Sequence, residues 1–166
     1  MERVPVTVYT DGSCKGNPGP GGWGAILVRD GKEEVIRGGS KNTTNNRMEL
    51  MAVIEAISEC KQPSDIYIYT DSTYVVMTKE KWVRYSKKQS KTQSVKNWDL
   101  WDALFKRTVT GKHMLHYRHI AGHSGHAMNE RCDRIAKEQA CKYSHAAAGT
   151  NTLTINEAVK ILAGRC

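Results

Sequence analysis

Two aspartates close two similar segments of this 166-residue chain. Asp11 ends the run Val6 to Asp11 and Asp71 ends the run Ile66 to Asp71, and both runs finish in Tyr-Thr-Asp. Alternating β-branched and aromatic residues favour extended strands. If the two strands are parallel neighbours, both carboxylates lie at the carboxyl end of a sheet, where open α/β sheets bind ligands. Such a pair could hold a metal ion, whereas a single Asp more often only begins a turn.

Other residues that could take part in chemistry each have an ordinary structural explanation. Glu49 stands three residues after Asn46, which is the capping-box position at a helix start. His119, His123 and His126 suggest zinc, but neither a cysteine pair nor a His-Glu-x-x-His helix accompanies them, which argues against a structural zinc site. His123 lies in a glycine-containing loop and suits a proton carrier or an exposed histidine.

The elements that must position these residues follow from periodicity and turn residues. The glycine-rich segment 12–22 predicts a hairpin loop that lets another chain approach, and it matches neither a Walker loop nor a dinucleotide fingerprint. Asp30-Gly31 predicts a tight hairpin turn between two further strands. Helical spacing and caps predict the later helices. The expected elements are strands at 6–11, 23–28, 33–38, 66–70 and 113–120, and helices from about 47 to 60, 97 to 109 and 128 to 143.

The charge is strongly basic, with a net value of +8. One segment, residues 79–96, carries seven lysines or arginines against a single acid and includes Trp82 and Tyr85. A one-sided basic run with aromatic residues suits a nucleic-acid backbone together with base or sugar stacking. The alternative is a solvated surface. We favour nucleic-acid binding.

Length and composition predict a single globular domain. Five cysteines without close pairing indicate a reducing compartment rather than a disulfide scaffold. The N-terminus lacks the apolar core of a signal peptide, and no run is long enough to cross a bilayer. We therefore expect a soluble cytoplasmic protein, most simply a monomer, with no membrane association.

Four segments together resemble type 1 ribonuclease H, in order and in spacing. They are the glycine-rich segment that follows Tyr9-Thr10-Asp11, then Thr43 to Leu50, then Thr70-Asp71-Ser72, then Gly122 to Asp133. The resemblance covers about residues 4 to 143. It implies an α/β fold of the ribonuclease H type: a five-stranded mixed sheet, three strands antiparallel and two parallel, with helices on both faces.

The resemblance also implies a metal-dependent endoribonuclease that hydrolyses the RNA strand of RNA–DNA hybrids, leaving 5′-phosphate and 3′-hydroxyl ends. By resemblance, Asp11, Glu49, Asp71 and Asp133 hold two Mg²⁺ ions, and Mn²⁺ is a possible substitute. Crowded carboxylates need cations to offset their repulsion, and oxygen-only ligands suit these metals. Asp133 would otherwise be taken for a solvated helix residue. His123 corresponds to a loop histidine that assists proton transfer or product release.

Substrate contacts are likewise implied by resemblance. Contacts to consecutive 2′-hydroxyls are expected from the minor-groove side, and a phosphate pocket for the DNA strand is expected at Thr44 and Asn97. Asn42 stands where this family often has an arginine, and the basic segment 79–96 is shorter than the family's basic handle. The expected substrate-binding residues are Cys14, Gly16, Asn17, Thr44, Asn45, Asn46, Trp82, Lys87, Lys88 and Asn97.

Two other functions stay open: a DNA-cutting nuclease on the same fold, and a non-catalytic hybrid-binding module. The histidine loop and the Asn-Arg-Met-Glu segment disfavour the first, and the presence of all four acids disfavours the second. The expected organisation is a catalytic domain at residues 1–143 and a flexible tail at 144–166 that ends in a short helix.

Overall fold

The computed structural model describes residues 1–87 and 95–147 of the chain. Ten helices and strands are assigned in these ranges, and five of them are strands that form one sheet. In chain order the elements are β1 (Val4–Cys14), β2 (Gly19–Arg29), β3 (Lys32–Thr43), α1 (Asn45–Ser58), β4 (Ser64–Thr70), α2 (Thr73–Val76), α3 (Thr78–Lys87), α4 (Trp98–Thr110), β5 (Met114–His119) and α5 (Ala127–Ala147).

The sheet has the strand order β3-β2-β1-β4-β5, so β1 lies at its centre. β1, β2 and β3 pair antiparallel, while β4 is parallel to β1 and β5 is parallel to β4. The register places Tyr9 opposite Tyr69, and their rings stack with centroids 5.1 Å apart. The predicted mixed sheet is confirmed, and so is the parallel pairing of the two strands that end in Tyr-Thr-Asp.

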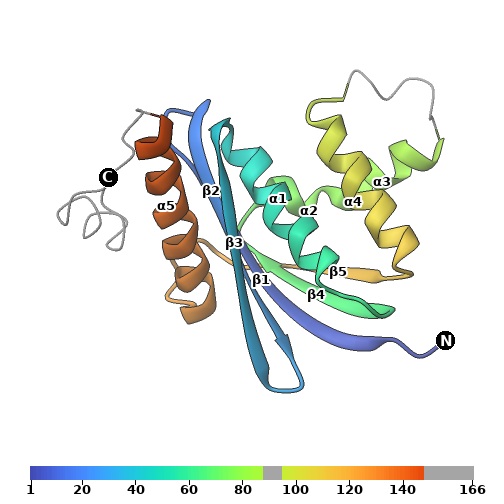
Figure 1. The fold of residues 1–166 in the computed structure, drawn as a ribbon. Helices are drawn as coiled ribbons and strands as arrows, with labels where there is room; N and C mark the ends of the chain where they lie inside the picture. Colours follow the sequence, from blue (N-terminus) through green and yellow to red (C-terminus); the bar gives the residue numbers. More distant parts are fainter. Residues whose placement is uncertain (88–94, 148–166) are drawn as a thin grey trace.

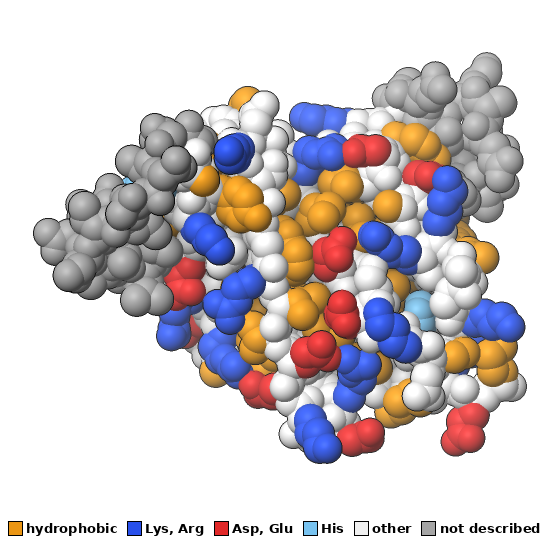
Figure 2. All heavy atoms as spheres, in the orientation of Figure 1, with side chains coloured by type: hydrophobic (Ala, Val, Ile, Leu, Met, Phe, Trp, Pro, Cys, Tyr) orange, Lys and Arg blue, Asp and Glu red, His pale blue; other side chains and the backbone are white. Residues whose placement is uncertain are grey.

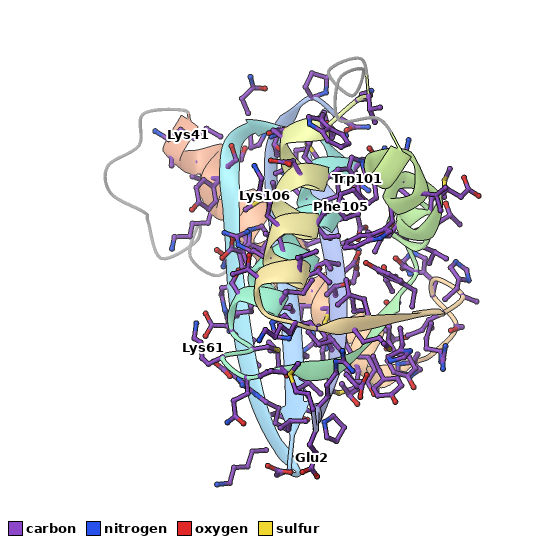
Figure 3. All side chains as sticks on the ribbon, turned by 90° about the vertical axis from the view of Figure 1, so that its right-hand side faces the viewer. Glu2, Lys41, Lys61, Trp101, Phe105 and Lys106 are labelled. Carbon is purple, nitrogen blue, oxygen red and sulfur yellow. The ribbon has the colours of Figure 1, made fainter. Side chains whose placement is uncertain are left out.

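Helices cover both faces of the sheet, as expected (Figure 1). α5 packs on β1, β2 and β3 from one side, and α1 packs on the same strands from the other, with α4 against α1. The main core lies on the α1 side, where Val8 and Ile68 meet Trp101 and Phe105 of α4. Figure 3 shows these last two side chains on α4, with the exposed Lys106 on the same helix. The aromatic residues of α4 therefore belong to the core, as predicted.

The glycine-rich segment differs from the prediction of a long loop. β1 continues to Cys14 and β2 begins at Gly19, so only residues 15–18 form the turn. The reason is packing: a Cβ atom on Gly22 would come within 2.4 Å of the backbone of α5, at Ala136 O and Ala140 N. Glycine lets α5 lie directly on β2. Gly22 thus serves as a strand residue under a helix, whereas Gly16 lies in the turn.

Two predicted helix boundaries also move. α1 begins at Asn45, with Thr44 as its N-cap residue, because the Thr44 side chain accepts a hydrogen bond from the Arg47 backbone N–H. α5 continues to Ala147, four residues beyond the predicted end at Tyr143, so Ser144 starts no tail. The proposed tail helix near residues 158–163 lies outside the described residues.

The basic segment 79–96 is partly helical, since α3 runs to Lys87. Figure 2 shows Lys and Arg side chains spread over one face of the molecule with acidic side chains between them, rather than gathered into one patch. Among the described residues, no helix is both long and apolar enough to span a membrane.

Candidate active site

Three acidic side chains come together where β1 and β4 end. Asp11 lies in β1, Asp71 follows β4 directly, and Glu49 lies in the first half of α1. One carboxylate oxygen of each residue lies within 4.8 Å of the others. Asp11 and Glu49 are only 4% and 3% exposed, whereas Asp71 is half-buried. The cluster therefore opens to solvent through Asp71.

A glycine brings the helix to the strand at this point. A Cβ atom on Gly12 would lie 2.4 Å from the backbone nitrogen of Glu49, a distance that real Cβ atoms do not tolerate. Because Gly12 has no side chain, α1 can contact the residue next to Asp11. The Gly12 N–H also donates a 2.8 Å hydrogen bond to Asp11 Oδ1, which fixes that carboxylate.

Burial and mutual repulsion change the proton affinity of these acids. Burial, followed by the charge of Asp71, raises the pKa of Asp11 from 3.8 to about 7. Burial, followed by the charge of Asp11, holds the pKa of Glu49 well above its usual range. Without a cation the cluster retains protons that isolated carboxylates would release.

Glu49 does not cap α1. The N-cap residue is Thr44, so Glu49 lies beyond the capping-box position, and its side chain is turned toward Asp11. Its Oε2 atom is buried without a hydrogen-bond partner. A buried carboxylate oxygen without a partner is costly unless a cation or a proton occupies the site. This observation favours the metal-ligand prediction over the capping explanation.

Asp133 is not brought into the three-residue cluster. It lies in the second turn of α5, where its Oδ2 pairs with Lys137 Nζ at 2.7 Å. Its charge is still one of the causes of the raised pKa of Asp11. The structure therefore assembles three of the four predicted acids and holds the fourth nearby on another element.

The histidine loop lies against the same carboxylates. A Cβ atom on Gly122 would be 3.2 Å from Asp71 Oδ2, so the loop passes directly beside that acid. His123 follows, exposed and with a left-handed backbone at φ 54°. Sequence reasoning missed Asn129 of α5, whose Nδ2 donates to Asp71 Oδ2 at 3.4 Å. The only indication of Asn129 in the sequence was its position between Gly122 and Asp133, one of the four segments that carry the family resemblance.

Several predicted substrate residues are joined across the chain. Asn17 and Gly16 lie in the turn between β1 and β2 and are exposed, and Asn17 Oδ1 accepts a 2.9 Å hydrogen bond from the backbone N–H of Asn45. Asn46 is next on the first turn of α1. The Cys14 thiol points inward, 3.3 Å from the Thr43 carbonyl oxygen. The turn and the start of α1 thus form one continuous surface.

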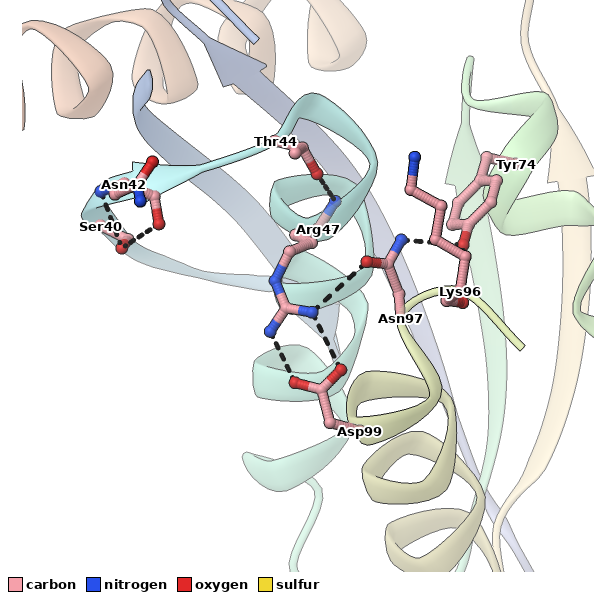
Figure 4. A network of polar contacts seen from close by, with 8 residues as sticks. All are labelled: Ser40, Asn42, Thr44, Arg47, Tyr74, Lys96, Asn97 and Asp99. Atoms are coloured by element: carbon pink, nitrogen blue, oxygen red, sulfur yellow. Dashed lines mark hydrogen bonds and ion pairs between the residues drawn. The ribbon is translucent and has the colours of Figure 1, made fainter. Parts of the chain in front are cut away.

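A second polar network holds the predicted phosphate pocket (Figure 4). Arg47 pairs with both carboxylate oxygens of Asp99, at 2.9 and 2.6 Å, and donates to Asn97 Oδ1 at 3.4 Å. Asn97 Nδ2 in turn donates to the Tyr74 hydroxyl at 3.0 Å. Thr44, whose oxygen caps α1, lies on the same side of the network. Thr44 and Asn97 are therefore linked through Arg47, whose backbone N–H donates to Thr44 and whose guanidinium donates to Asn97. Arg47, Tyr74 and Asp99 are supporting residues that sequence reasoning did not identify.

The predicted contacts in the basic segment have a different setting. Trp82 packs edge-on against Phe105, with ring centroids 4.7 Å apart, and lies against the main core. Lys87 is the last residue of α3, but its side chain is not described, and Lys88 lies outside the described residues. The structure gives Trp82 a packing role beside its predicted role in binding.

Comparison with known proteins agrees with this geometry. The RNase H family model matches residues 3–141. The chain is 46% identical to ribonuclease H of Nitratidesulfovibrio vulgaris, across 86% of this chain and 93% of that protein. It is 50% identical to ribonuclease H of Cupriavidus metallidurans, across 79% of this chain and 92% of that protein.

A solved structure also matches the fold. LC9-RNase H1, described as a type 1 RNase H with the type 2 active-site motif, superposes with a TM-score of 0.71 at 27% identity, covering 97% of this chain and 86% of that one. These matches define the class of protein, an RNase H-like nuclease fold with an acidic site. The chain belongs to the RNase H family.

Proposed function

We propose that this protein is an endonuclease that hydrolyses the RNA strand of RNA–DNA hybrids and leaves 5′-phosphate and 3′-hydroxyl ends. The observation that carries the proposal is the buried cluster of Asp11, Glu49 and Asp71 at the carboxyl ends of two parallel strands. Relatives at 46% and 50% identity carry the name ribonuclease H, and they match this chain over nearly their whole length.

The residues of the cluster fit divalent cations. All three donors are carboxylates, the ligands that Mg²⁺ and Mn²⁺ prefer, and Glu49 Oε2 is buried without a partner. Asp11, Glu49 and Asp71 would hold the ions, with Asp133 completing the set from α5. When bound, two such ions supply an activated water and stabilise the leaving 3′ oxygen.

In this proposal, residues outside the acidic cluster bind and orient the substrate. The surface formed by Gly16, Asn17, Asn45 and Asn46 presents backbone and amide groups suited to 2′-hydroxyls, which distinguish RNA from DNA. Thr44 and Asn97 would bind a phosphate of the DNA strand; both contact Arg47, which supports this assignment. His123, exposed beside Gly122, is placed to move a proton at the edge of the cluster.

The wider setting is part of the same proposal. Mg²⁺ is the expected ion, with Mn²⁺ able to replace it. We also propose that it acts as a cytoplasmic monomer that removes RNA primers and stray hybrids during replication; its net charge of +8 suits a nucleic-acid substrate.

The test compares cleavage of an end-labelled RNA–DNA hybrid by the wild-type chain and by an Asp71→Asn variant, both with Mg²⁺ at low salt. We expect the variant to lose at least about 100-fold in rate, because a ligand of the cations is removed while the fold is kept. Duplex DNA in parallel reactions separates the DNA-cutting alternative. Equal cutting by both preparations would contradict the assigned site, and binding without cutting would favour a hybrid-binding module.

A further inference from the structure

Asn129 is a buried polar residue that touches the acidic cluster from a separate element. It is 4% exposed, in the first turn of α5, and its Nδ2 donates to Asp71 Oδ2 at 3.4 Å. Asp71 is the most exposed of the three clustered acids and comes directly after a strand end. A carboxylate there needs an outside contact to fix its orientation, and Asn129 provides one.

The other end of the same amide has no partner. Asn129 Oδ1 is buried and makes no hydrogen bond within the described residues, as is also true of Glu49 Oε2. Burying an amide oxygen without a partner costs free energy, so such an atom points to a missing donor. Because the amide nitrogen of Asn129 donates to Asp71, the unpaired oxygen of the same amide is held close to the acidic cluster.

The backbone of Asn129 is itself held by the histidine loop. The Asn129 N–H donates to His126 Nδ1 at 3.4 Å, so His126 caps α5. The His126 ring also lies 5.6 Å from that of Tyr9, two residues before Asp11. The position of Asn129 is therefore fixed from both its backbone and its side chain.

We propose that Asn129 is a positioning residue for the cation site. Its amide nitrogen orients the Asp71 carboxylate toward the cations, and its unpaired amide oxygen accepts a hydrogen bond from a water of hydration there. Residues that hydrogen-bond to metal ligands set their orientation, and their loss usually weakens metal binding by about 10- to 100-fold. The inference rests on the proposed function, because it needs the acidic cluster to bind a divalent cation.

The test measures Mg²⁺ binding by the full chain without substrate, by following the amide signals of ¹⁵N-labelled protein during a titration. An Asn129→Ala variant removes both groups of the amide. An Asn129→Ser variant also removes the amide, and it keeps a polar side chain that is too short to reach Asp71. The matched control is Cys132→Ala, on the next turn of α5, which deletes a buried thiol that bonds to the Tyr9 carbonyl oxygen at 3.3 Å.

We expect both Asn129 variants to bind Mg²⁺ at least about tenfold more weakly than the wild type. Cys132→Ala should lose stability while keeping the wild-type affinity. In hybrid cleavage at saturating Mg²⁺, the Asn129 variants should lower kcat more than they raise KM. Wild-type affinity in both Asn129 variants would overturn this inference alone. A wild-type chain that binds no Mg²⁺ would overturn it together with the proposed function.

Discussion

At the level of single residues, Asp11 and Glu49 are buried acids whose carboxyls oppose folding. Both are nearly fully buried; burial and the charge of Asp71 raise the pKa of Asp11, and burial and the charge of Asp11 raise the pKa of Glu49. Burying carboxylates this close together costs stability unless protons or cations offset their charge. The cluster therefore lowers folding stability while it serves a chemical function, as is common at functional sites.

The pKa of Asp11 predicts how stability depends on pH when cations are removed. Between 3.8, its ordinary value, and about 7, its value in the folded chain, the folded state keeps a proton that the unfolded state has released. Stability in EDTA should therefore fall as pH rises through this range, by up to ~1.4 kcal/mol per pH unit from this residue. Asp11→Asn should show a shallower decline and greater stability than the wild type at pH 8, measured by urea unfolding. Parallel curves for the two proteins would contradict the assignment.

The site was only partly predictable from its residues. Asp11 and Asp71 follow from a repeated strand pattern, because strand alternation and parallel pairing place both at one sheet edge. Glu49 and Asp133 required the family resemblance, since a helix acid at such a position ordinarily caps or faces solvent. Asn129 could not be recognised, because its role depends on how the start of α5 approaches Asp71, which no local pattern records.

At the level of elements, the close contact between β2 and α5 depends on missing side chains. Gly22 and Gly24 of β2 both face α5. A Cβ atom on Gly22 would lie 2.4 Å from the α5 backbone, whereas one on Gly24 would meet the Ile135 side chain at 2.6 Å and the Cys132 carbonyl oxygen only at 3.2 Å. A side chain can move aside more easily than a helix backbone can, so the two positions should differ in tolerance.

Gly22→Ala should lower the free energy of unfolding by about 3 kcal/mol, and Gly24→Ala by about 1 kcal/mol, because only the first forces α5 away from the sheet. Urea unfolding with divalent cations present measures both variants under one condition. Gly24→Ala serves as the matched control for adding one methyl group to the same strand. Equal losses in the two variants would show that α5 does not rest on β2 as described.

Elements with local determinants were predicted well. The turn at Asp30-Gly31 has φ values of 49° and 73°, as its residues favour, and the buried face of α4 follows its helical spacing. The glycine-rich segment was interpreted wrongly as a loop because glycine marks turns and close packing alike. Only the distant helix α5 decides between these two meanings.

At the level of the whole molecule, the chain carries a net charge of +8. On the face shown in Figure 2, the basic side chains are spread out rather than gathered into one patch. Several of its cations are already paired: Arg47 with Asp99, Arg131 with Glu33 and Lys137 with Asp133. Long-range attraction to a polyanion depends on the overall charge as well as on individual contacts. The excess charge should therefore speed encounter with nucleic acid, while the site selects the hybrid.

Hybrid binding should consequently be sensitive to salt. Raising the salt concentration from about 50 to 200 mM should increase KM for the hybrid at least about tenfold, because phosphate contacts release counterions. The value of kcat should change far less, since the buried acids are shielded from added ions. Steady-state cleavage at fixed Mg²⁺ across this range checks both numbers. A KM that stays constant would mean that phosphate contacts contribute little to binding.

The order of the elements along the chain has a consequence for synthesis on the ribosome. All three clustered acids are encoded within the first 71 residues, together with four of the five strands. α4, which packs against α1, and α5, which covers the second face of the sheet, are synthesised last, and the Asn129 contact to Asp71 comes with α5. A nascent chain thus contains the three clustered acids well before the helices that complete the domain have been synthesised. Its competence to cut arises late, once nearly the whole domain has been released.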